Sequence, residues 1–284
     1  MSSPNAIGRF LQFIRFSHTI FALPFALASM LVAARGLPPW RIVFFILLCM
    51  VFARTAAMLF NRIVDWKYDI ENTRTAGRQR LVSKPVAIVC CMVSTVLFMI
   101  SAFAINRLCG VLSPVALGAI LFYSMTKRFT HFAQFFLGVA LAVAPVGAWL
   151  AVTGRLTWAP IILSCGVILW VAGFDTIYAT QDVEFDRSAQ LYSLVVWLGI
   201  PKALRLALIL HFIAFLFFIG FGYVAMLGIA YYAGLAIIFG SFVYEHRAAR
   251  KQSIEAINQA FFASNAFVSF VFVASVISAI VLQR

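Results

Sequence analysis

Nine long apolar segments run through this chain. Each has about 20 mostly apolar residues, and they lie at about 16–34, 42–61, 86–105, 108–124, 134–152, 159–180, 203–222, 224–243 and 262–282. A helix needs about 20 such residues to cross a bilayer, and blocks without period-two alternation do not build an outer-membrane barrel. Only 11% of the residues are charged, whereas roughly a quarter are charged in soluble proteins. We therefore predict an all-α fold, a polytopic membrane bundle of nine transmembrane helices.

Basic residues are distributed unevenly between the two ends of these segments. Of the 22 Lys and Arg, 16 lie in loops on the side of the N-terminus, five lie on the other side, and Arg54 lies inside the second segment. Because loops rich in Lys and Arg stay in the cytoplasm, we predict a multi-pass protein of the bacterial inner membrane with a cytoplasmic N-terminus and a C-terminus on the opposite side. Arg9 and Arg15 precede the first segment, which we expect to be a retained span and not a cleaved signal peptide. The net charge of +13 follows mostly from this asymmetry and gives little reason to propose a nucleic acid partner.

Acidic residues are few and clustered. The chain has only nine Asp and Glu, and all of them map to the predicted cytoplasmic side. Two clusters, one after the second segment and one at the end of the sixth, contain seven of them: Asp65, Asp69, Glu71, Asp175, Asp182, Glu184 and Asp186.

Within each cluster, acidic or amide side chains recur every four residues. Successive residues of an α-helix turn by 100°, so residues four apart lie on one face. Asn61, Asp65 and Asp69 therefore form one stripe, and Asp182 and Asp186 form a second. Mg²⁺ is commonly held by one or two carboxylates together with substrate phosphate, and no set of His or Cys ligands accompanies the stripes to suggest zinc or copper. The alternative is that these acids are solvated loop residues, but two clusters of equal spacing favour Mg²⁺ as the cofactor.

Lys and Arg accompany both stripes. They are Arg62, Lys67, Arg74 and Arg78 near the first, Arg187 near the second, and Lys127 with Arg128 between the fourth and fifth segments. Carboxylates hold metal ions, metal ions bind a diphosphate, and basic side chains take the remaining phosphate charge. The assembly is typical of a diphosphate-binding site.

Arg54 lies in the middle of the second span, where a guanidinium costs roughly 2.5 to 3.5 kcal/mol on insertion scales. It precedes Asn61 by seven residues and so lies about two turns deeper on nearly the same face. A snorkelling or structurally paired arginine is one interpretation. The other, which we favour, is that Arg54 binds the carboxylate of a second substrate.

Three motifs resemble a known family. "NRIVDWKYD" fits an NxxxDxxxD pattern, "DTIYATQDVEFD" fits a second DxxxD region preceded by Tyr178, and "YSMTK", from Tyr123 to Lys127, fits a YxxxK motif. Together they are similar to the UbiA superfamily of intramembrane aromatic prenyltransferases, and the resemblance covers nearly the whole chain, which implies a single domain over residues 1–284. "RTAAMLFNRIVD", "NTRTAGR" and "SHTIFALPFA" look most like the 4-hydroxybenzoate polyprenyltransferase-like branch. "RQRLVSK" departs from the pattern because relatives usually have Pro and Gly after the basic residues.

The resemblance implies a central cavity open to the cytoplasmic side and a set of site residues. The implied metal ligands are Asn61, Asp65, Asp69, Asp182 and Asp186, and the four aspartates are also the implied catalytic residues. The implied substrate-binding residues are Arg54, Arg62, Arg74, Tyr123, Lys127 and Tyr178. Metal ions would stabilise the leaving diphosphate, an aromatic ring would attack the allylic cation, and the polyprenyl tail would reach membrane lipid. Asp65 or Asp182 would remove the ring proton, an assignment that stays open because a metal-bound carboxylate is weakly basic.

We therefore predict an Mg²⁺-dependent enzyme that transfers a polyprenyl group from polyprenyl diphosphate to a hydroxylated aromatic acid. The acceptor is 4-hydroxybenzoate or a naphthoate-type precursor, in ubiquinone or menaquinone biosynthesis. One alternative is a prenyltransferase with a haem or lipid-glycerol acceptor. Another is a cation-coupled transporter, a class of protein in which internal repeats and intramembrane acids occur. A transporter is expected to place its acids near the bilayer midplane, whereas these cluster at the ends of the spans.

Overall fold

The computed structural model describes residues 5–15, 21–71, 75, 77–250 and 254–283. All regular elements in these ranges are helices, which confirms the all-α prediction. The long helices are α2 (Leu23–Ala34), α3 (Trp40–Val64), α5 (Lys84–Ile105), α6 (Arg107–Thr126), α7 (Ala133–Thr153), α8 (Trp158–Ala179), α11 (Ile200–Val224), α12 (Ile229–Ala249) and α13 (Ile254–Leu282). The short ones are α1 (Ala6–Phe13), α4 (Trp66–Glu71), η2 (Arg78–Arg80), η3 (Thr180–Asp182), α9 (Val183–Ser188) and α10 (Leu194–Leu198).

Each of the nine predicted spans corresponds to one of the long helices. The predicted number of membrane-crossing helices is nevertheless approximate. Seven segments of the described chain are long and apolar enough to cross a membrane. Helix α2 has 12 residues because it begins only at Leu23, after the N-cap residue Ala22, whereas the predicted span began at about residue 16. Helix α12 is the other one outside the seven, and its last turns carry Glu245, His246 and Arg247.

The boundary between the seventh and eighth spans differs from the prediction. We expected the break near residues 222–224, whereas α11 continues to Val224 and α12 begins at Ile229. The chain turns at Met226, which has a positive φ of 53°, and Leu227 N donates a hydrogen bond to Gly222 O at 2.9 Å. Hydrophobicity is continuous across this turn, so it gives no local signal of the helix end.

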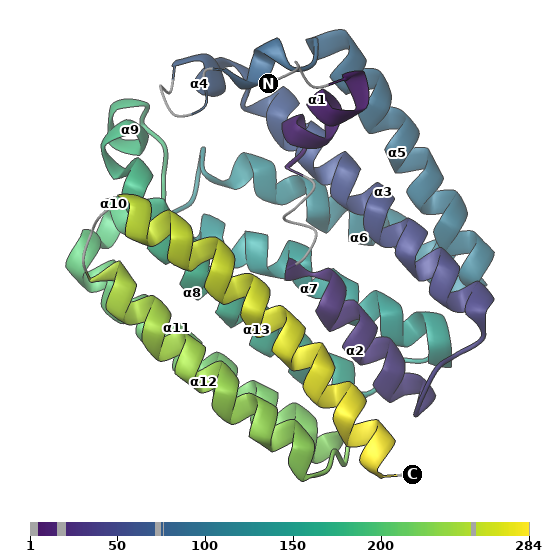
Figure 1. The fold of residues 1–284 in the computed structure, drawn as a ribbon. Coiled ribbons are helices and arrows are strands. Elements are labelled where there is room, and N and C mark those ends of the chain that lie inside the picture. Colours follow the sequence, from purple (N-terminus) through teal and green to yellow (C-terminus); the bar gives the residue numbers. More distant parts are fainter. Residues whose placement is uncertain (1–4, 16–20, 72–74, 76, 251–253, 284) are drawn as a thin grey trace.

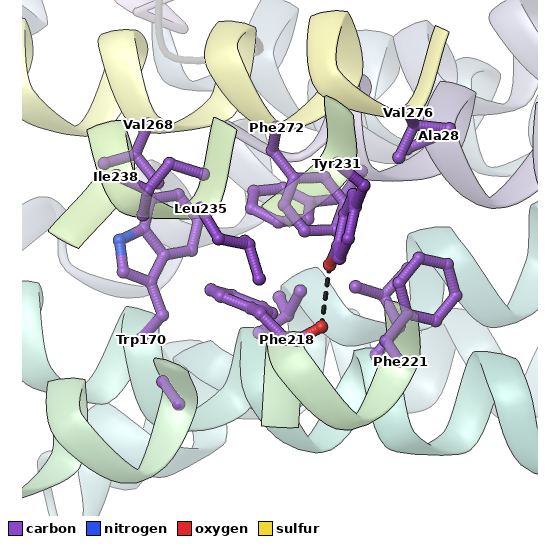
Figure 2. Packing of buried hydrophobic residues seen from close by; sticks show 14 of the residues in the cluster. Ala28, Trp170, Phe218, Phe221, Tyr231, Leu235, Ile238, Val268, Phe272 and Val276 are labelled. Atoms are coloured by element: carbon purple, nitrogen blue, oxygen red, sulfur yellow. Dashed lines mark hydrogen bonds between the residues drawn. The ribbon is translucent and has the colours of Figure 1, made fainter. Parts of the chain in front are cut away.

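The largest hydrophobic core lies between α2 and the helices of the second half of the chain. Figure 2 shows Trp170 of α8, Phe218 of α11, Tyr231 of α12 and Phe272 of α13 packed together. Tyr231 Oη donates a hydrogen bond to Phe218 O at 2.7 Å, which satisfies the one polar group of this side chain inside an apolar region. The core holds α8, which leads to the second acidic cluster, against α11.

Helices α7 and α8 approach closely at Gly138. A Cβ atom at this position would lie 2.5 Å from the carbonyl oxygen of Ile168, so only glycine allows the observed contact. In Figure 1 the short elements α4, α9 and α10 all lie at one end of the bundle, away from the C-terminus. Both acidic clusters belong to this end, because α4 follows α3 and α9 follows α8.

Candidate active site

The first acidic stripe lies where α3 ends. Asp65 follows the last residue of α3, and Asp69 lies in the short helix α4. The helical spacing persists across this break, because Asp65 N donates to Asn61 O at 2.9 Å and Asp69 N donates to Asp65 O at 2.8 Å. Asn61 Nδ2 also donates to Asp65 Oδ2 at 3.1 Å. The predicted four-residue periodicity therefore brings the three side chains to one side of the chain, although they do not share one straight helix.

The second stripe lies beyond the end of α8. Asp182 is in the 3₁₀ turn η3, and Asp186 is in α9. The carboxylate of Asp186 is 2% exposed and accepts a hydrogen bond from Lys127 Nζ at 3.2 Å. Lys127 is the first residue after α6, so the second stripe is tied to the loop between α6 and α7.

The next residue of that loop, Arg128, binds the first stripe. Its Nη2 atom donates to Asp65 Oδ1 at 2.9 Å and to the carbonyl oxygen of Val64 at 3.0 Å. The guanidinium also lies over the ring of Tyr68, 5.5 Å from its centroid. Two consecutive residues of one loop thus contact both acidic stripes, which brings the stripes to the same site.

A cavity of about 740 Å³ opens between these elements. Ten predicted site residues line it: Arg54, Asn61, Arg62, Asp65, Asp69, Tyr123, Lys127, Tyr178, Asp182 and Asp186. Arg74, the remaining predicted site residue, lies outside the described residues. Most of the other wall is apolar and reaches Ile46 near the start of α3 and Ile105 at the end of α5. The cavity therefore combines a charged end beside the loops with a deep apolar part.

Ion pairs organise the charged end. Arg62 Nη1 donates to Asp69 Oδ2 at 3.0 Å, and both side chains are at most 10% exposed. Burial raises the pKa of Asp65 to about 6, an effect that Arg128 opposes and Asp69 reinforces. Burial alone would lower the pKa of Lys127, but Asp186, Asp175 and Asp182 act in the opposite direction, and the net effect is a raised pKa. Lys127 is therefore a permanent cation at the charged end of the cavity.

The oxygen donors fit a divalent cation that arrives together with an anionic ligand. In the described part of the chain, no three His, Cys, Asp or Glu side chains are close enough to hold a metal ion by themselves. Asp65, Asp69 and Asp186 instead pair with Arg128, Arg62 and Lys127. Mg²⁺ usually takes one or two carboxylates and completes its coordination with phosphate oxygens and water. Hard oxygen donors spread around a cation-lined cavity suit that mode of binding.

Sequence reasoning did not assign two residues that the structure brings into the cavity. Arg128 was noted as a neighbouring cation, but its link to Asp65 spans 63 positions and leaves no mark in local spacing. Asp175 lies seven residues before Asp182 and also lines the cavity. A signal was present for Asp175, because seven residues are two helical turns and keep two side chains on nearly the same face.

Together, the fold and the cavity define a multi-pass membrane protein with a carboxylate-rich, cation-lined site at one end of a long apolar pocket. The chain belongs to the UbiA prenyltransferase family, whose model matches residues 22–271. This membership confirms the resemblance found in the motifs and the prediction of a prenyltransferase.

Named relatives and solved structures agree with this assignment. The chain is 32% identical to a 4-hydroxybenzoate octaprenyltransferase of Vibrio atlanticus (strain LGP32), over 87% of this chain and 88% of the relative. A UbiA homolog from Aeropyrum pernix K1, solved in its apo form, has a TM-score of 0.83 and 29% identity and covers 92% of this chain and 97% of its own. A UbiA homolog from Archaeoglobus fulgidus bound to GPP and Mg²⁺ has a TM-score of 0.73, covers 96% of this chain and 99% of its own, and at 20% identity shows the fold alone.

Proposed function

We propose that this protein transfers a polyprenyl group from polyprenyl diphosphate to the ring of 4-hydroxybenzoate, as in ubiquinone biosynthesis. The observation that carries the proposal is that Lys127 and Arg128 join two acidic stripes at one cavity. The names of the relatives favour 4-hydroxybenzoate over a naphthoate-type acceptor. The proposal treats residues 1–284 as one catalytic domain.

The charged end of the cavity would bind the diphosphate. Asn61, Asp65, Asp69, Asp182 and Asp186 would hold Mg²⁺, which, when bound, neutralises the developing charge of the leaving diphosphate. Ammonium and guanidinium groups would bind the phosphate oxygens directly, and the residues that provide them are Arg62, Arg74 and Lys127, with the hydroxyl of Tyr123 beside them. Arg62, Tyr123 and Lys127 lie at the loop end of the cavity, whereas Arg74 is outside the described residues. The anion would therefore enter from that side. The excess of Lys and Arg in the loops supports a cytoplasmic location for this side and for the N-terminus.

The apolar part of the cavity would bind the prenyl chain. Its wall extends from the charged end to Ile46 and Ile105. C1 of the donor, the carbon bonded to the diphosphate, would lie just inside the charged end. The rest of the prenyl chain would lie deeper among the helices, in reach of lipid. Tyr178 packs against Phe261 with ring centroids 4.3 Å apart and the ring planes tilted by 36°, and both residues line the cavity. Their ring faces would stabilise positive charge at C1 as the C–O bond breaks.

The aromatic acid would bind beside C1 with its carboxylate on Arg54. The Nε atom of Arg54 is buried and has no hydrogen-bond partner, although its side chain lines the cavity. A bound carboxylate would satisfy this donor with a charge-assisted hydrogen bond. The ring would then be fixed while the carbon ortho to its hydroxyl attacks C1.

The test is a transfer assay on membranes that contain the protein. Membranes are incubated with Mg²⁺, labelled polyprenyl diphosphate and, in separate reactions, 4-hydroxybenzoate, a dihydroxynaphthoate, haem or a glycerol phosphate. The expected result is labelled product with 4-hydroxybenzoate and its loss when Mg²⁺ is removed by a chelator. Product with another acceptor only, or undiminished product after chelation, contradicts the proposal.

A further inference from the structure

Arg54 and Asp175 each precede an acidic stripe by the same interval, and both line the cavity. Arg54 precedes Asn61 by seven residues in α3, and Asp175 precedes Asp182 by seven residues at the end of α8. At a rise of 1.5 Å per residue, Arg54 lies roughly 15 Å inside the end of α3, and Asp175 lies roughly 6 Å inside the end of α8. Both side chains line the cavity. A cation and a carboxylate therefore lie within the helices that form the cavity, whereas the predicted aspartate ligands lie beyond the ends of α3 and α8.

Neither side chain has its polar atoms satisfied within the described part of the chain. The Nε atom of Arg54 is buried without a hydrogen-bond partner. Asp65, Asp69 and Asp186 each form a salt bridge, whereas Asp175 forms no salt bridge or hydrogen bond with any described residue, although the charge of Lys127 acts on it. Inside a membrane bundle such groups are costly unless a ligand completes them.

We infer that Asp175 binds the hydroxyl group of the acceptor, so that the aromatic acid lies across the cavity with its carboxylate on Arg54 and its para hydroxyl on Asp175. The inference rests on the proposed function and adds to it a second anchor for the acceptor. A para-hydroxylated acid is the ligand that suits a cation on one wall and a carboxylate on the other. The phenolic O–H would donate to Asp175, and the carboxylate oxygens would accept from Arg54.

Asp175 is also a better candidate for the proton acceptor than the stripe aspartates. A carboxylate that binds a metal ion is a weak base, and Asp65 and Asp182 belong to the predicted metal ligands. Asp175 is not one of those ligands, and it lines the cavity from within α8. It therefore fills the role of base that reasoning from the motifs left open between Asp65 and Asp182.

Proton transfer to and from Asp175 accompanies formation of the new C–C bond. The ring carbon ortho to the hydroxyl forms a bond to C1 while the C1–O bond to diphosphate breaks, and the phenolic proton moves to Asp175. The ring is then a neutral dienone. Its ortho proton passes to the released diphosphate, Asp175 returns its proton to the oxygen, and the ring is aromatic again. The products are the prenylated acid and hydrogen diphosphate.

Binding measurements separate the role of Asp175 from that of Arg54. The protein in nanodiscs, with Mg²⁺ and inorganic diphosphate, is titrated with labelled 4-hydroxybenzoate and with benzoate, which lacks the hydroxyl. We expect the wild type to prefer 4-hydroxybenzoate by at least about tenfold, because a site built for a hydroxyl rejects the analogue without it. In Asp175→Asn this preference should fall severalfold with the Kd for benzoate and diphosphate unchanged. Arg54→Ala should weaken both aromatic acids equally.

The matched control is Glu184→Gln, a change at an exposed carboxylate nine residues along the chain that is not part of the cavity wall. It should retain the wild-type preference. In single-turnover assays, Asp175→Asn should slow product formation by about 10²-fold or more, the usual contribution of a general base.

Three results overturn the inference. One is an unchanged preference in Asp175→Asn. Another is loss of Mg²⁺ and diphosphate binding in that variant, which assigns Asp175 to the metal site. The third uses the wild type and therefore applies even if the variant does not fold. 4-Methoxybenzoate has no hydroxyl proton to donate, so binding of this analogue as tight as that of 4-hydroxybenzoate refutes the hydrogen bond to Asp175. A wild type that binds no hydroxybenzoate refutes the proposed function as well, so the two failures are distinguishable.

Discussion

Lys127 and Arg128 are adjacent in the chain but bind carboxylates from different halves of the molecule. Lys127 Nζ lies 3.2 Å from Asp186 Oδ2, and Arg128 Nη2 lies 2.9 Å from Asp65 Oδ1. The loop between α6 and α7 therefore sets the separation of the two acidic stripes. In the absence of metal ions, these cations also reduce the repulsion between the carboxylates.

The two stripes should be equally necessary for catalysis. We expect Asp65→Ala and Asp182→Ala each to lower transfer by at least about a thousandfold, because several kcal/mol of stabilisation of the leaving group would be lost. The measurement is transfer of label from polyprenyl diphosphate in membranes, normalised to the amount of inserted protein. Glu184→Gln serves as the control. Full activity in either alanine variant contradicts the assignment of metal ligands.

Arg54→Ala should act on the acceptor alone. We expect KM for the aromatic acid to rise by about 10-fold to 100-fold, the equivalent of losing a hydrogen bond between charged groups of about 1.5–3 kcal/mol. KM for polyprenyl diphosphate should change little, because Arg54 lies two turns from the stripe on α3. Steady-state kinetics with each substrate varied in turn give both values. An unchanged KM for the acceptor would return Arg54 to a purely structural role.

Arg62 should contribute to stability as well as to binding. Its salt bridge with Asp69 is buried, with an Nη1–Oδ2 distance of 3.0 Å. Arg62→Met should lower the free energy of unfolding by about 2 kcal/mol, the range for buried hydrogen bonds between charged groups. Unfolding in mixed micelles measures this change. Arg80→Met, at an exposed position, is the control, and equal stabilities of the two variants would show that the buried pair adds nothing.

Gly138→Ala should separate α7 from α8. The added Cβ atom would lie 2.5 Å from Ile168 O and 2.9 Å from Ile168 Cα, and backbone atoms cannot move aside as a flexible side chain can. We expect a loss of about 1–3 kcal/mol, as for other overpacked sites, and a higher KM for polyprenyl diphosphate because α8 leads to Asp182. Thermal unfolding and kinetics test both. At Gly240 a Cβ atom meets no neighbour, so Gly240→Ala should behave as the wild type does.

Local spacing predicted the acidic stripes but not their shape. The four-residue repeat from Asn61 to Asp69 survives as consecutive backbone hydrogen bonds, yet α3 ends at Val64 and α4 begins at Trp66. Similarly, Asp182 and Asp186 lie on two short helices and not on an extension of α8. Spacing constrains neighbours along the chain, whereas the direction of a helix after its end depends on the elements that pack against it.

The sequence by itself determined that the chain is helical, that it enters a membrane and that it carries oxygen ligands and phosphate-binding cations in two clusters. These properties depend on residue type and on intervals of a few residues, which hydrophobicity and helical geometry fix locally. Only the tertiary structure decided that Arg128 pairs with Asp65, that Lys127 pairs with Asp186, and that Arg54 and Asp175 line one cavity. The partners in each of the two ion pairs are about 60 positions apart in the sequence. The packing of whole helices sets the distances between such residues.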